Sequence, residues 1–271
     1  FEAMGLDYVY APFHVKLDNG AGLKKAVDGI RAMNIRGVNV TIPHKERVLK
    51  FLDETHESAQ YIGAVNTILN DNGSLIGYNT DMLGYIDGLD ADLKAQGIGD
   101  FSMTNKKVVS IGAGGSARAI IVGLFTYGVD SVIIANRDVE RARKLINEEN
   151  EKRLENLRNG IVELINFKAT SVPLKDISEH LHDADLLVNT TPVGMMDIGS
   201  LDIDLSKLPD HAIVSDIVYT PLETDLLKRA RARGLKTVSG LSMLVHQGAL
   251  AFELWTGKKA PVKIMTDAAL E

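Results

Sequence analysis

The sequence lacks several features that would point to particular classes of protein. It has no cysteine, which excludes disulfide bonds, thiolate nucleophiles and cysteine-ligated metals and suits a reducing compartment. The seven histidines show no spacing typical of a zinc site, so we expect no bound metal. No apolar run approaches the roughly 18 residues that a membrane-spanning helix requires. We therefore expect a cytoplasmic protein.

An excess of positive charge is also absent, because 30 lysines and arginines stand against 36 aspartates and glutamates. The formal net charge of −6 leaves few cations to displace the counterions of a phosphate backbone. We therefore expect neither nucleic acid nor an anionic membrane as a partner. The 271 residues are 45% hydrophobic and 24% charged, close to the averages of globular domains, and suggest one large or two medium domains.

The middle of the chain alternates short β-branched runs with longer helical segments. A strand at 106–111, a glycine-rich turn at 112–117 and a buried helix at 119–125 lead into a second strand at 131–136. This order forms a βαβ unit, and such units build parallel sheets. Further strands are expected at 162–165, 185–189, 212–217 and 236–238. The pattern predicts a doubly wound, Rossmann-type dinucleotide-binding domain over residues 105–240.

The first part of the chain is organised differently. Strands are expected at 8–10, 37–41, 64–69 and 75–79, and helices at 23–33 and 45–52. This pattern predicts a smaller mixed α/β domain over residues 1–104, which would bind the substrate. The apolar C-terminal helices, at about 241–271, would complete it. The expected fold class is therefore α/β with two domains.

The turn from Gly112 to Gly115 is a variant of the dinucleotide-binding fingerprint. Gly112 permits the tight turn, and Gly114 lets the backbone approach a pyrophosphate. The N–H groups that open the following helix can then bind the phosphate oxygens. Because the turn follows a strand and begins a helix, we interpret it as a cofactor site rather than a structural turn.

The end of the second strand bears on which dinucleotide is bound. NAD-binding domains of this kind usually carry an acidic residue there, whereas this chain has Asn136 and Arg137, with Arg141 one helical turn further on. Two guanidinium groups can hold a 2′-phosphate, which favours NADP. Asp138 counts in the other direction, because a carboxylate repels a phosphate or binds a bare ribose. NAD therefore stays open.

Polar residues also gather where the strands of the first region end. The segment 39–45 runs from a strand to Lys45, Asn66 follows a short apolar run, and 79–81 ends the next apolar segment with Asp81. Side chains of this kind at strand ends can line a cleft for a small polyhydroxylated acid. A lysine beside an aspartate is a proton-transfer pair suited to the oxidation of an alcohol.

Motifs along essentially the whole chain resemble the shikimate dehydrogenases, including the quinate/shikimate dehydrogenase branch. They occur in the family's order. The matching segments are GLDY at 5–8, NVTIPHK at 39–45, GAVNT at 63–67, GYNTD at 77–81, GAGGSAR at 112–118, NR at 136–137, NTTPVGM at 189–195, DIVY at 216–219 and residues 240–249.

The resemblance implies an oxidoreductase that interconverts 3-dehydroshikimate and shikimate with NADP, in chorismate and aromatic amino-acid biosynthesis. It makes Lys45 the general acid/base and Asp81 its partner. The residues it implies for substrate binding are Thr41, Asn66, Tyr219 and Gln247. Those implied for the cofactor are Gly112, Ala113, Gly114 and Gly115 at the pyrophosphate, Asn136, Arg137 and Arg141 at the adenosine ribose, and Thr190, Pro192, Val193, Ile217, Gly240 and Met243 along the nicotinamide half.

Two departures from the family pattern leave alternatives open. The family's opening strand, with a Ser-x-Ser motif that holds the substrate carboxylate, has no counterpart, and we expect it upstream of Phe1. Asp138 stands where NADP-dependent members often carry Thr, so an NAD-dependent quinate/shikimate dehydrogenase is the first alternative. A non-catalytic dinucleotide-binding module is the second. We expect a small-molecule substrate as partner and a monomer or homodimer.

Overall fold

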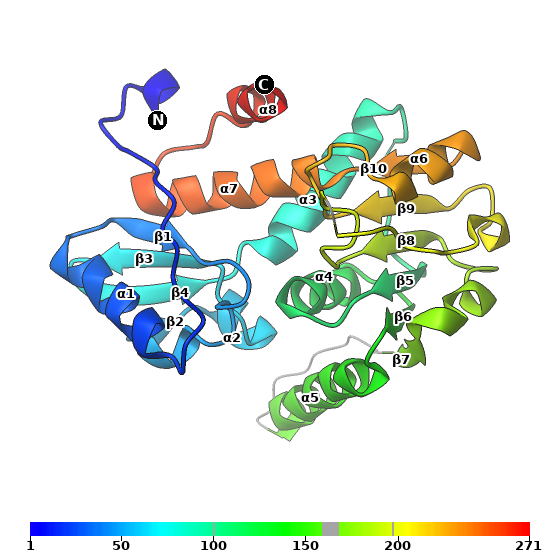
Figure 1. The fold of residues 1–271 in the computed structure, drawn as a ribbon, viewed down its shortest axis with the longest axis horizontal. Coiled ribbons are helices and arrows are strands. Elements are labelled where there is room, and N and C mark those ends of the chain that lie inside the picture. The colour runs from blue at the N-terminus through cyan, green and yellow to red at the C-terminus, as the bar shows by residue number, and fades with distance from the viewer. Residues whose placement is uncertain (100, 159–167, 197) are drawn as a thin grey trace. The chain divides into compact units, whose positions relative to one another are not determined.

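The computed structural model of the chain describes residues 1–99, 101–158, 168–196 and 198–271. The chain divides into two compact units (Figure 1). Unit 1 comprises Phe1–Gly84 and Val245–Glu271, and unit 2 comprises Tyr85–Leu244. The sequence placed the domain boundaries at 104/105 and 240/241, and these boundaries remain a prediction.

Unit 1 is built on a four-stranded sheet in the order β1-β3-β4-β2, in which β2 is parallel to β4 and the other neighbours are antiparallel. The strands are β1 (Gly37–Asn39), β2 (Glu54–Thr55), β3 (Thr67–Asp71) and β4 (Ser74–Tyr78). Asn72 and Gly73 join β3 to β4 with positive φ angles of 53° and 96°, as a tight hairpin turn of this kind requires.

Helices cover this sheet. They are α1 (Ala21–Ala32), α2 (Glu57–Ile62) and the C-terminal part of α7 (Gly240–Thr256), with short 3₁₀ turns at η1 (Glu2–Met4) and η2 (Leu49–Phe51). The last helix, α8 (Val262–Leu270), packs on α7 instead, through an apolar cluster with Ala249 and Phe252. Leu23, Val27 and Ile30 recur on one face of α1 and pack with Ile68 and Leu75 of the sheet. The apolar spacing of α1 thus directs its buried face onto β3 and β4.

Two expected elements of unit 1 do not form. Residues 8–10 are exposed and irregular rather than a strand, and the Tyr10 hydroxyl donates a hydrogen bond to Asn39 Oδ1 of β1 at 2.9 Å. Residues 45–52 form turns and η2 rather than a continuous helix. The carbonyl of Lys45, which a helix would pair with the N–H of Leu49, instead accepts a hydrogen bond from Val65 N at 2.8 Å.

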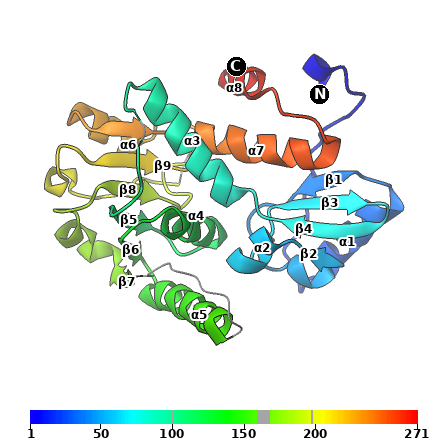
Figure 2. The ribbon, with the colours of Figure 1, turned by 180° about the vertical axis from the view of Figure 1, so that it is seen from behind.

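Unit 2 contains a six-stranded, wholly parallel sheet in the order β10-β9-β8-β5-β6-β7 (Figure 2). The strands are β5 (Lys107–Ile111), β6 (Ser131–Asn136), β7 (Lys168–Pro173), β8 (Leu186–Asn189), β9 (Ile213–Asp216) and β10 (Lys236–Val238). The strand order reverses between β5 and β8, which is the topological switch point where ligands bind in doubly wound folds. The expected Rossmann-type class is therefore confirmed.

The helices of unit 2 lie on both faces of this sheet. They are most of α3 (Asp81–Ala95), α4 (Gly115–Thr126), α5 (Val139–Arg158) and α6 (Asp225–Ala232), with 3₁₀ turns at η3 (Leu174–His180) and η4 (Leu205–Lys207). Separate apolar clusters fill the two faces. The strand expected at 162–165 lies outside the described residues, whereas β7 was not expected. No described helix has the length and apolar character needed to span a membrane.

Trp255, the single tryptophan of the chain, locks α7 onto the sheet of unit 1. Its indole N–H donates to Ile68 O at 3.0 Å, and a Cβ on Gly37 would overlap the indole and lie 2.6 Å from the same carbonyl. Glycine is therefore the residue that lets the indole reach β3.

We expect Gly37→Ala to lower the free energy of unfolding by about 2–3 kcal/mol, because the new methyl group must displace the indole from a packed site. Urea unfolding followed by the fluorescence of Trp255 measures this change. Gly248→Ala is the matched control, because its Cβ would meet only Met265 at 3.6 Å and it lies within α7. Gly248→Ala should leave the free energy of unfolding unchanged or raise it. A Gly37→Ala variant as stable as wild type would contradict the packing argument.

Candidate active site

A buried ion pair joins two polar segments of unit 1. Lys45 Nζ lies 2.5 Å from Asp81 Oδ2, and the side chains are 12% and 5% exposed. Lys45 lies in the loop after β1, and Asp81 is the first residue of α3. A carboxylate in the first turn of a helix is favoured by the partial positive charge at that end. The structure thus brings together the lysine and the aspartate that the sequence analysis paired.

Asn66 connects the ion pair to the ends of β3 and β4. Its Nδ2 donates to Asp81 Oδ1 at 2.7 Å and to Thr80 Oγ1 at 2.9 Å. Its Oδ1 accepts hydrogen bonds from Thr80 N at 2.8 Å and from Thr67 Oγ1 at 3.1 Å. Both ends of the amide are engaged, so the second carboxylate oxygen of Asp81 is held in a fixed direction.

Backbone hydrogen bonds hold these segments in register. Val40 N donates to Asn66 O at 2.7 Å, and Asn66 N donates to Tyr78 O at 3.1 Å. The loop after β1, the start of β3 and the end of β4 therefore meet at one edge of the sheet. This edge can present an ammonium group, a carboxylate and fixed amide and hydroxyl groups to a small polar ligand.

The other residues expected at the substrate have separate placements. Thr41 follows β1 with an exposed side chain. Gln247 lies on α7 beside Gly84 of α3, where a Cβ on Gly84 would come within 2.6 Å of Gln247 N. Its backbone therefore packs on the helix that begins with Asp81. Tyr219 belongs to unit 2, where it follows β9 with 43% of its surface exposed.

The glycine turn of unit 2 lies between β5 and α4, as the sequence predicts. Gly112 has a φ of 111°, and a Cβ there would lie 2.6 Å from Thr190 Oγ1, so any side chain would collide with the segment after β8. Ala113 is buried, and Gly114 is the N-cap of α4, which begins at Gly115. The first N–H groups of α4 therefore start at the turn, where an anion is favoured.

Arg141 lies over this turn. Its Nη2 is 3.8 Å from the position that a Cβ on Gly114 would occupy. Asp138, the residue that left the cofactor open, is engaged elsewhere, because its Oδ1 accepts hydrogen bonds from Glu140 N at 3.1 Å and Arg141 N at 3.4 Å. It therefore acts as the N-cap of α5. Asn136 Nδ2 donates to the carbonyl of Asp138 at 2.7 Å, and Arg137 is exposed.

Asp216, at the end of β9, ties together three segments of unit 2. Its Oδ1 accepts hydrogen bonds from Asn189 Nδ2 at 2.9 Å and Val218 N at 3.0 Å, and its Oδ2 accepts from Thr224 Oγ1 at 2.8 Å. Burial raises the pKa of this carboxyl to about 6, although the three hydrogen bonds oppose the shift. Asn189 also donates to Val193 O at 3.0 Å, so the segment that carries Thr190, Pro192 and Val193 is fixed through Asp216.

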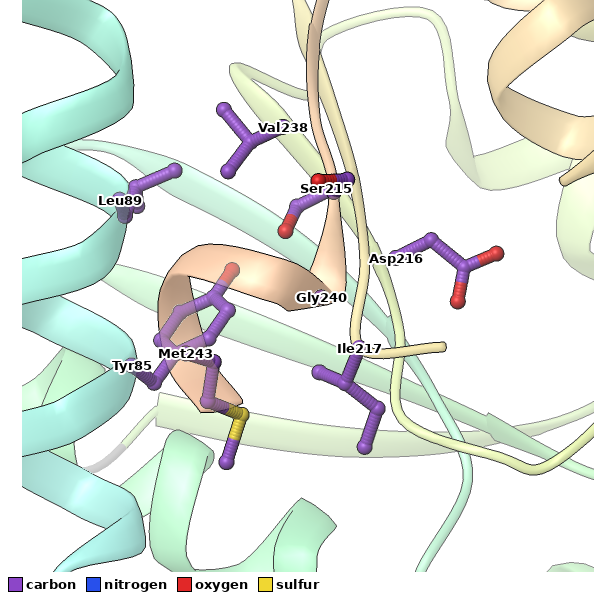
Figure 3. Close-up of a pocket in the computed structure, with 9 residues that line it drawn as sticks. Tyr85, Leu89, Ser215, Asp216, Ile217, Val238, Gly240 and Met243 are labelled. Carbon is purple, nitrogen blue, oxygen red and sulfur yellow. The ribbon is translucent and has the colours of Figure 1, made fainter. Parts of the chain in front are cut away.

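Three residues expected along the nicotinamide half line one small pocket of unit 2. Ile217, Gly240 and Met243 surround it together with Tyr85 and Leu89 of α3 (Figure 3). Gly240 is required here, because a Cβ would overlap the carbonyl of Ile217. Figure 3 shows the carboxylate of Asp216 pointing away from the other labelled side chains. The pocket is therefore lined mainly by apolar groups.

Three features of these sites were not found from the sequence. The capping role of Asp138 had a signal, since an aspartate before a helix with an acidic first turn is typical of an N-terminus. Asp216 and Tyr85 had none, because a carboxylate after a strand and a tyrosine within an apolar helix are common in cores. Among the described ranges, no group of three or more His, Asp or Glu side chains is placed to hold a metal.

Three family models match the chain in succession. The model described as the shikimate dehydrogenase substrate binding domain matches residues 1–68. The shikimate/quinate 5-dehydrogenase model matches residues 93–218, and the shikimate 5′-dehydrogenase C-terminal domain matches residues 240–270.

Individual proteins resemble the chain over nearly its whole length. A shikimate dehydrogenase (NADP(+)) of Desulforamulus reducens is 41% identical in an alignment that covers 98% of this chain and 85% of that protein. Shikimate 5-dehydrogenase from Thermus thermophilus, solved with NADP(H) and shikimate, is 36% identical with a TM-score of 0.80, covering 99% of this chain and 90% of its own. Quinate dehydrogenase from Corynebacterium glutamicum, solved with NAD, is 34% identical with a TM-score of 0.83 and the same two coverages.

The raised pKa of Asp216 predicts a pH-dependent cost in stability. Between pH 3.8 and about 6 the folded chain keeps a proton that the unfolded chain has lost, so rising pH destabilises the fold. Asp216→Asn cannot ionise. We expect its free energy of unfolding to rise relative to wild type by about 2–3 kcal/mol between pH 4 and pH 7, as measured by urea unfolding.

Asp204→Asn is the control for this measurement. Asp204 is an exposed carboxylate whose pKa is lowered by hydrogen bonds from Ser206, so its removal should change the pH dependence in the opposite direction. A difference between Asp216→Asn and wild type that stays constant with pH would contradict the assigned cause.

Proposed function

Because the chain belongs to the shikimate dehydrogenase family, we propose that it is an NADP-dependent oxidoreductase that interconverts 3-dehydroshikimate and shikimate. This reaction is a step in the biosynthesis of chorismate and the aromatic amino acids. The observation that carries the proposal is the buried Lys45–Asp81 ion pair, which a module that only bound dinucleotides would not need. The chain is an enzyme, and its cofactor is NADP.

Lys45 is the general acid/base in this proposal. When bound, NADPH supplies a hydride to the carbonyl carbon of 3-dehydroshikimate. Lys45 Nζ donates a proton to the oxygen on that carbon as negative charge develops, and accepts it in the reverse direction. Its ammonium group, on a side chain that is 12% exposed, also stabilises that charge. Asp81 Oδ2, at 2.5 Å, fixes the position of Nζ.

The residues that hold NADP in this proposal follow from the shape of unit 2. The glycine turn and the start of α4 fit a pyrophosphate, because Gly112 and Gly114 bring backbone rather than side chains to it. Arg141, beside Gly114, and Arg137, at the end of β6, are assigned to the 2′-phosphate, with Asn136 at the ribose. Ala113 and Gly115 are assigned to the pyrophosphate with the other residues of the turn. The residues assigned to the nicotinamide half are Thr190, Pro192, Val193, Ile217, Gly240 and Met243.

For the substrate, we assign Asn66, Thr41 and Gln247 of unit 1 and Tyr219 of unit 2 to the hydroxyl and carboxylate groups. Asn66 is held at the Lys45–Asp81 pair, which supports its assignment most directly. The NAD-dependent quinate alternative relied on Asp138 at the ribose, and its engagement as a helix cap counts against that reading. We also propose a cytoplasmic location and a monomer or homodimer.

Lys45→Met tests the acid/base assignment. The side chain keeps its length but cannot carry a proton, so we expect kcat for shikimate oxidation to fall by about 10²–10⁴-fold. The affinity for NADP, measured by calorimetry, should stay unchanged. Lys50→Met is the control, since Lys50 is an exposed lysine of the same unit and should keep full activity. Turnover above a tenth of wild type would rule out the role of Lys45.

Arg141→Ala tests the assignment of the cofactor. Loss of one charge-assisted hydrogen bond to a 2′-phosphate costs about 1.5–3 kcal/mol, so kcat/KM with NADPH should fall by about 10- to 100-fold. The value with NADH should change little. Arg143→Ala, two residues along α5 where Arg143 pairs with Glu140, is the control. Asp138→Thr keeps a capping oxygen but removes a negative charge, and should strengthen the preference for NADP.

A wild-type enzyme that prefers NADH would contradict the cofactor assignment. Equal losses with both cofactors in Arg141→Ala would instead show that Arg141 supports the fold of the turn and does not distinguish the two dinucleotides.

A further inference from the structure

Thr67 lies at the buried centre of a row of polar side chains that ends at the ion pair of Lys45 and Asp81. The residue is 0% exposed and begins β3, directly opposite Asn39 at the end of β1. Asn39 Nδ2 lies 3.1 Å from Thr67 Oγ1, which in turn lies 3.1 Å from Asn66 Oδ1. Asn66 Nδ2 donates to Asp81 Oδ1 at 2.7 Å. The row therefore runs from β1 to the carboxylate that holds the lysine.

Backbone groups at the two ends of this row fix the direction of its hydrogen bonds. At one end, Asn39 Nδ2 faces the backbone carbonyl of Asn66 at 3.4 Å, and a carbonyl only accepts. The same nitrogen therefore donates to Thr67 Oγ1. At the other end, Thr80 N donates to Asn66 Oδ1 at 2.8 Å, so this atom is the amide oxygen. The one proton of the Thr67 hydroxyl is then donated to Asn66 Oδ1, because Thr80 Oγ1 is more distant at 3.4 Å.

The direction of these bonds has a consequence for Asp81. Hydrogen bonds in a chain polarise one another, so a donor to the oxygen of an amide strengthens the bonds that its nitrogen donates. Thr67 thus restrains the Asn66 amide and strengthens its hydrogen bond to Asp81 Oδ1. The other oxygen, Asp81 Oδ2, lies 2.5 Å from Lys45 Nζ. Because a carboxylate held at Oδ1 presents Oδ2 in one direction, the position of Nζ depends on Thr67 through two intermediate side chains.

We infer that Thr67 is a positioning residue for the proton transfer by Lys45, acting through Asn66 and Asp81. Its hydroxyl is engaged by an amide on each side, so we assign it no contact with the substrate. This inference rests on the proposed function and adds a residue to the machinery behind the ion pair. The competing role is a hydroxyl that serves only the stability of β3.

Thr67→Val and Thr67→Ser separate the two roles, because valine keeps the shape of threonine without its hydroxyl, whereas serine keeps the hydroxyl without the methyl group. We expect Thr67→Val to lower kcat for shikimate oxidation by about three- to tenfold, through the loss of one hydrogen bond. KM for NADP should not change. Thr67→Ser should keep more than half of the wild-type kcat, although the loss of a buried methyl group lowers its Tm by about 2–4 °C.

Thr266→Val is the matched control for the loss of a hydroxyl. Thr266 belongs to α8 of the same unit, and its Oγ1 donates to Val262 O at 2.9 Å, outside the row. Its removal should leave kcat at the wild-type value. A Thr67 hydroxyl that served stability alone would likewise lower Tm in Thr67→Val and leave kcat of the folded enzyme unchanged.

A second measurement follows the row in the protein without substrate or cofactor. In protein labelled with ¹⁵N-asparagine, NMR detects the side-chain amide of Asn66 as the signal that Asn66→Ser lacks. We expect its Nδ2 protons to exchange with solvent about three- to tenfold faster in Thr67→Val than in wild type, because the amide has lost one of its restraints. In Thr67→Ser and Thr266→Val they should exchange at the wild-type rate.

The inference is overturned if Thr67→Val keeps the wild-type kcat, if Thr67→Ser loses as much kcat as Thr67→Val, or if amide exchange is the same in Thr67→Val and wild type. A failure of the proposed function is distinct, because it would appear as a wild-type protein that does not oxidise shikimate with NADP. The exchange measurement would then still decide whether Thr67 orients the Asn66 amide.

Discussion

The buried ion pair between Lys45 and Asp81 constrains how three segments of unit 1 meet. Two charges removed from water destabilise a fold unless each finds close partners. Asp81 has three sources of compensation, which are Lys45, the amide of Asn66 and the N-terminal end of α3. They come from the loop after β1, the start of β3 and the end of β4, so the pair is stable only where these segments meet. A group able to transfer a proton is held there as a consequence.

Unit 2 also buries a carboxylate, that of Asp216, but surrounds it with neutral hydrogen-bond donors. Asp216 accepts hydrogen bonds from an amide side chain, a backbone N–H and a hydroxyl, but it has no cation among its described neighbours. Burial therefore dominates, and its pKa rises where that of an ion-paired carboxylate would fall. The carboxylate joins the exits of β8 and β9 to the start of α6. This cross-link orders the loops at the switch point, where a dinucleotide fold needs rigid walls.

Local patterns in the sequence predicted those parts of the structure that local physics decides. The β-branched runs gave the parallel strands, and the glycine turn at 112–115 opened α4 as expected. The polar strand ends brought Lys45, Asp81 and Asn66 together. The two elements that were predicted wrongly, at 8–10 and 45–52, both make contacts with residues that are distant in the sequence. Residues 45–52 have helical spacing, but the N–H of Val65 donates a hydrogen bond to the carbonyl of Lys45. Residues 8–10 alternate like a strand, but the side chain of Tyr10 contacts Asn39 and Trp255, which lie far along the chain. A local sequence pattern does not show such long-range contacts.

Asp138 shows why a residue type at a motif position does not by itself decide which cofactor is bound. As a free carboxylate near a 2′-phosphate it would oppose NADP. As the N-cap of α5 its Oδ1 receives two backbone N–H groups, and the helix end offsets part of its charge. The same cap sets where α5 begins, and this start places Arg141 over Gly114. The acidic residue therefore supports the position of the arginine that binds the phosphate in the proposed site. In the proposed site, the choice between NADP and NAD then depends on the direction in which Arg141 leaves the first turn of α5.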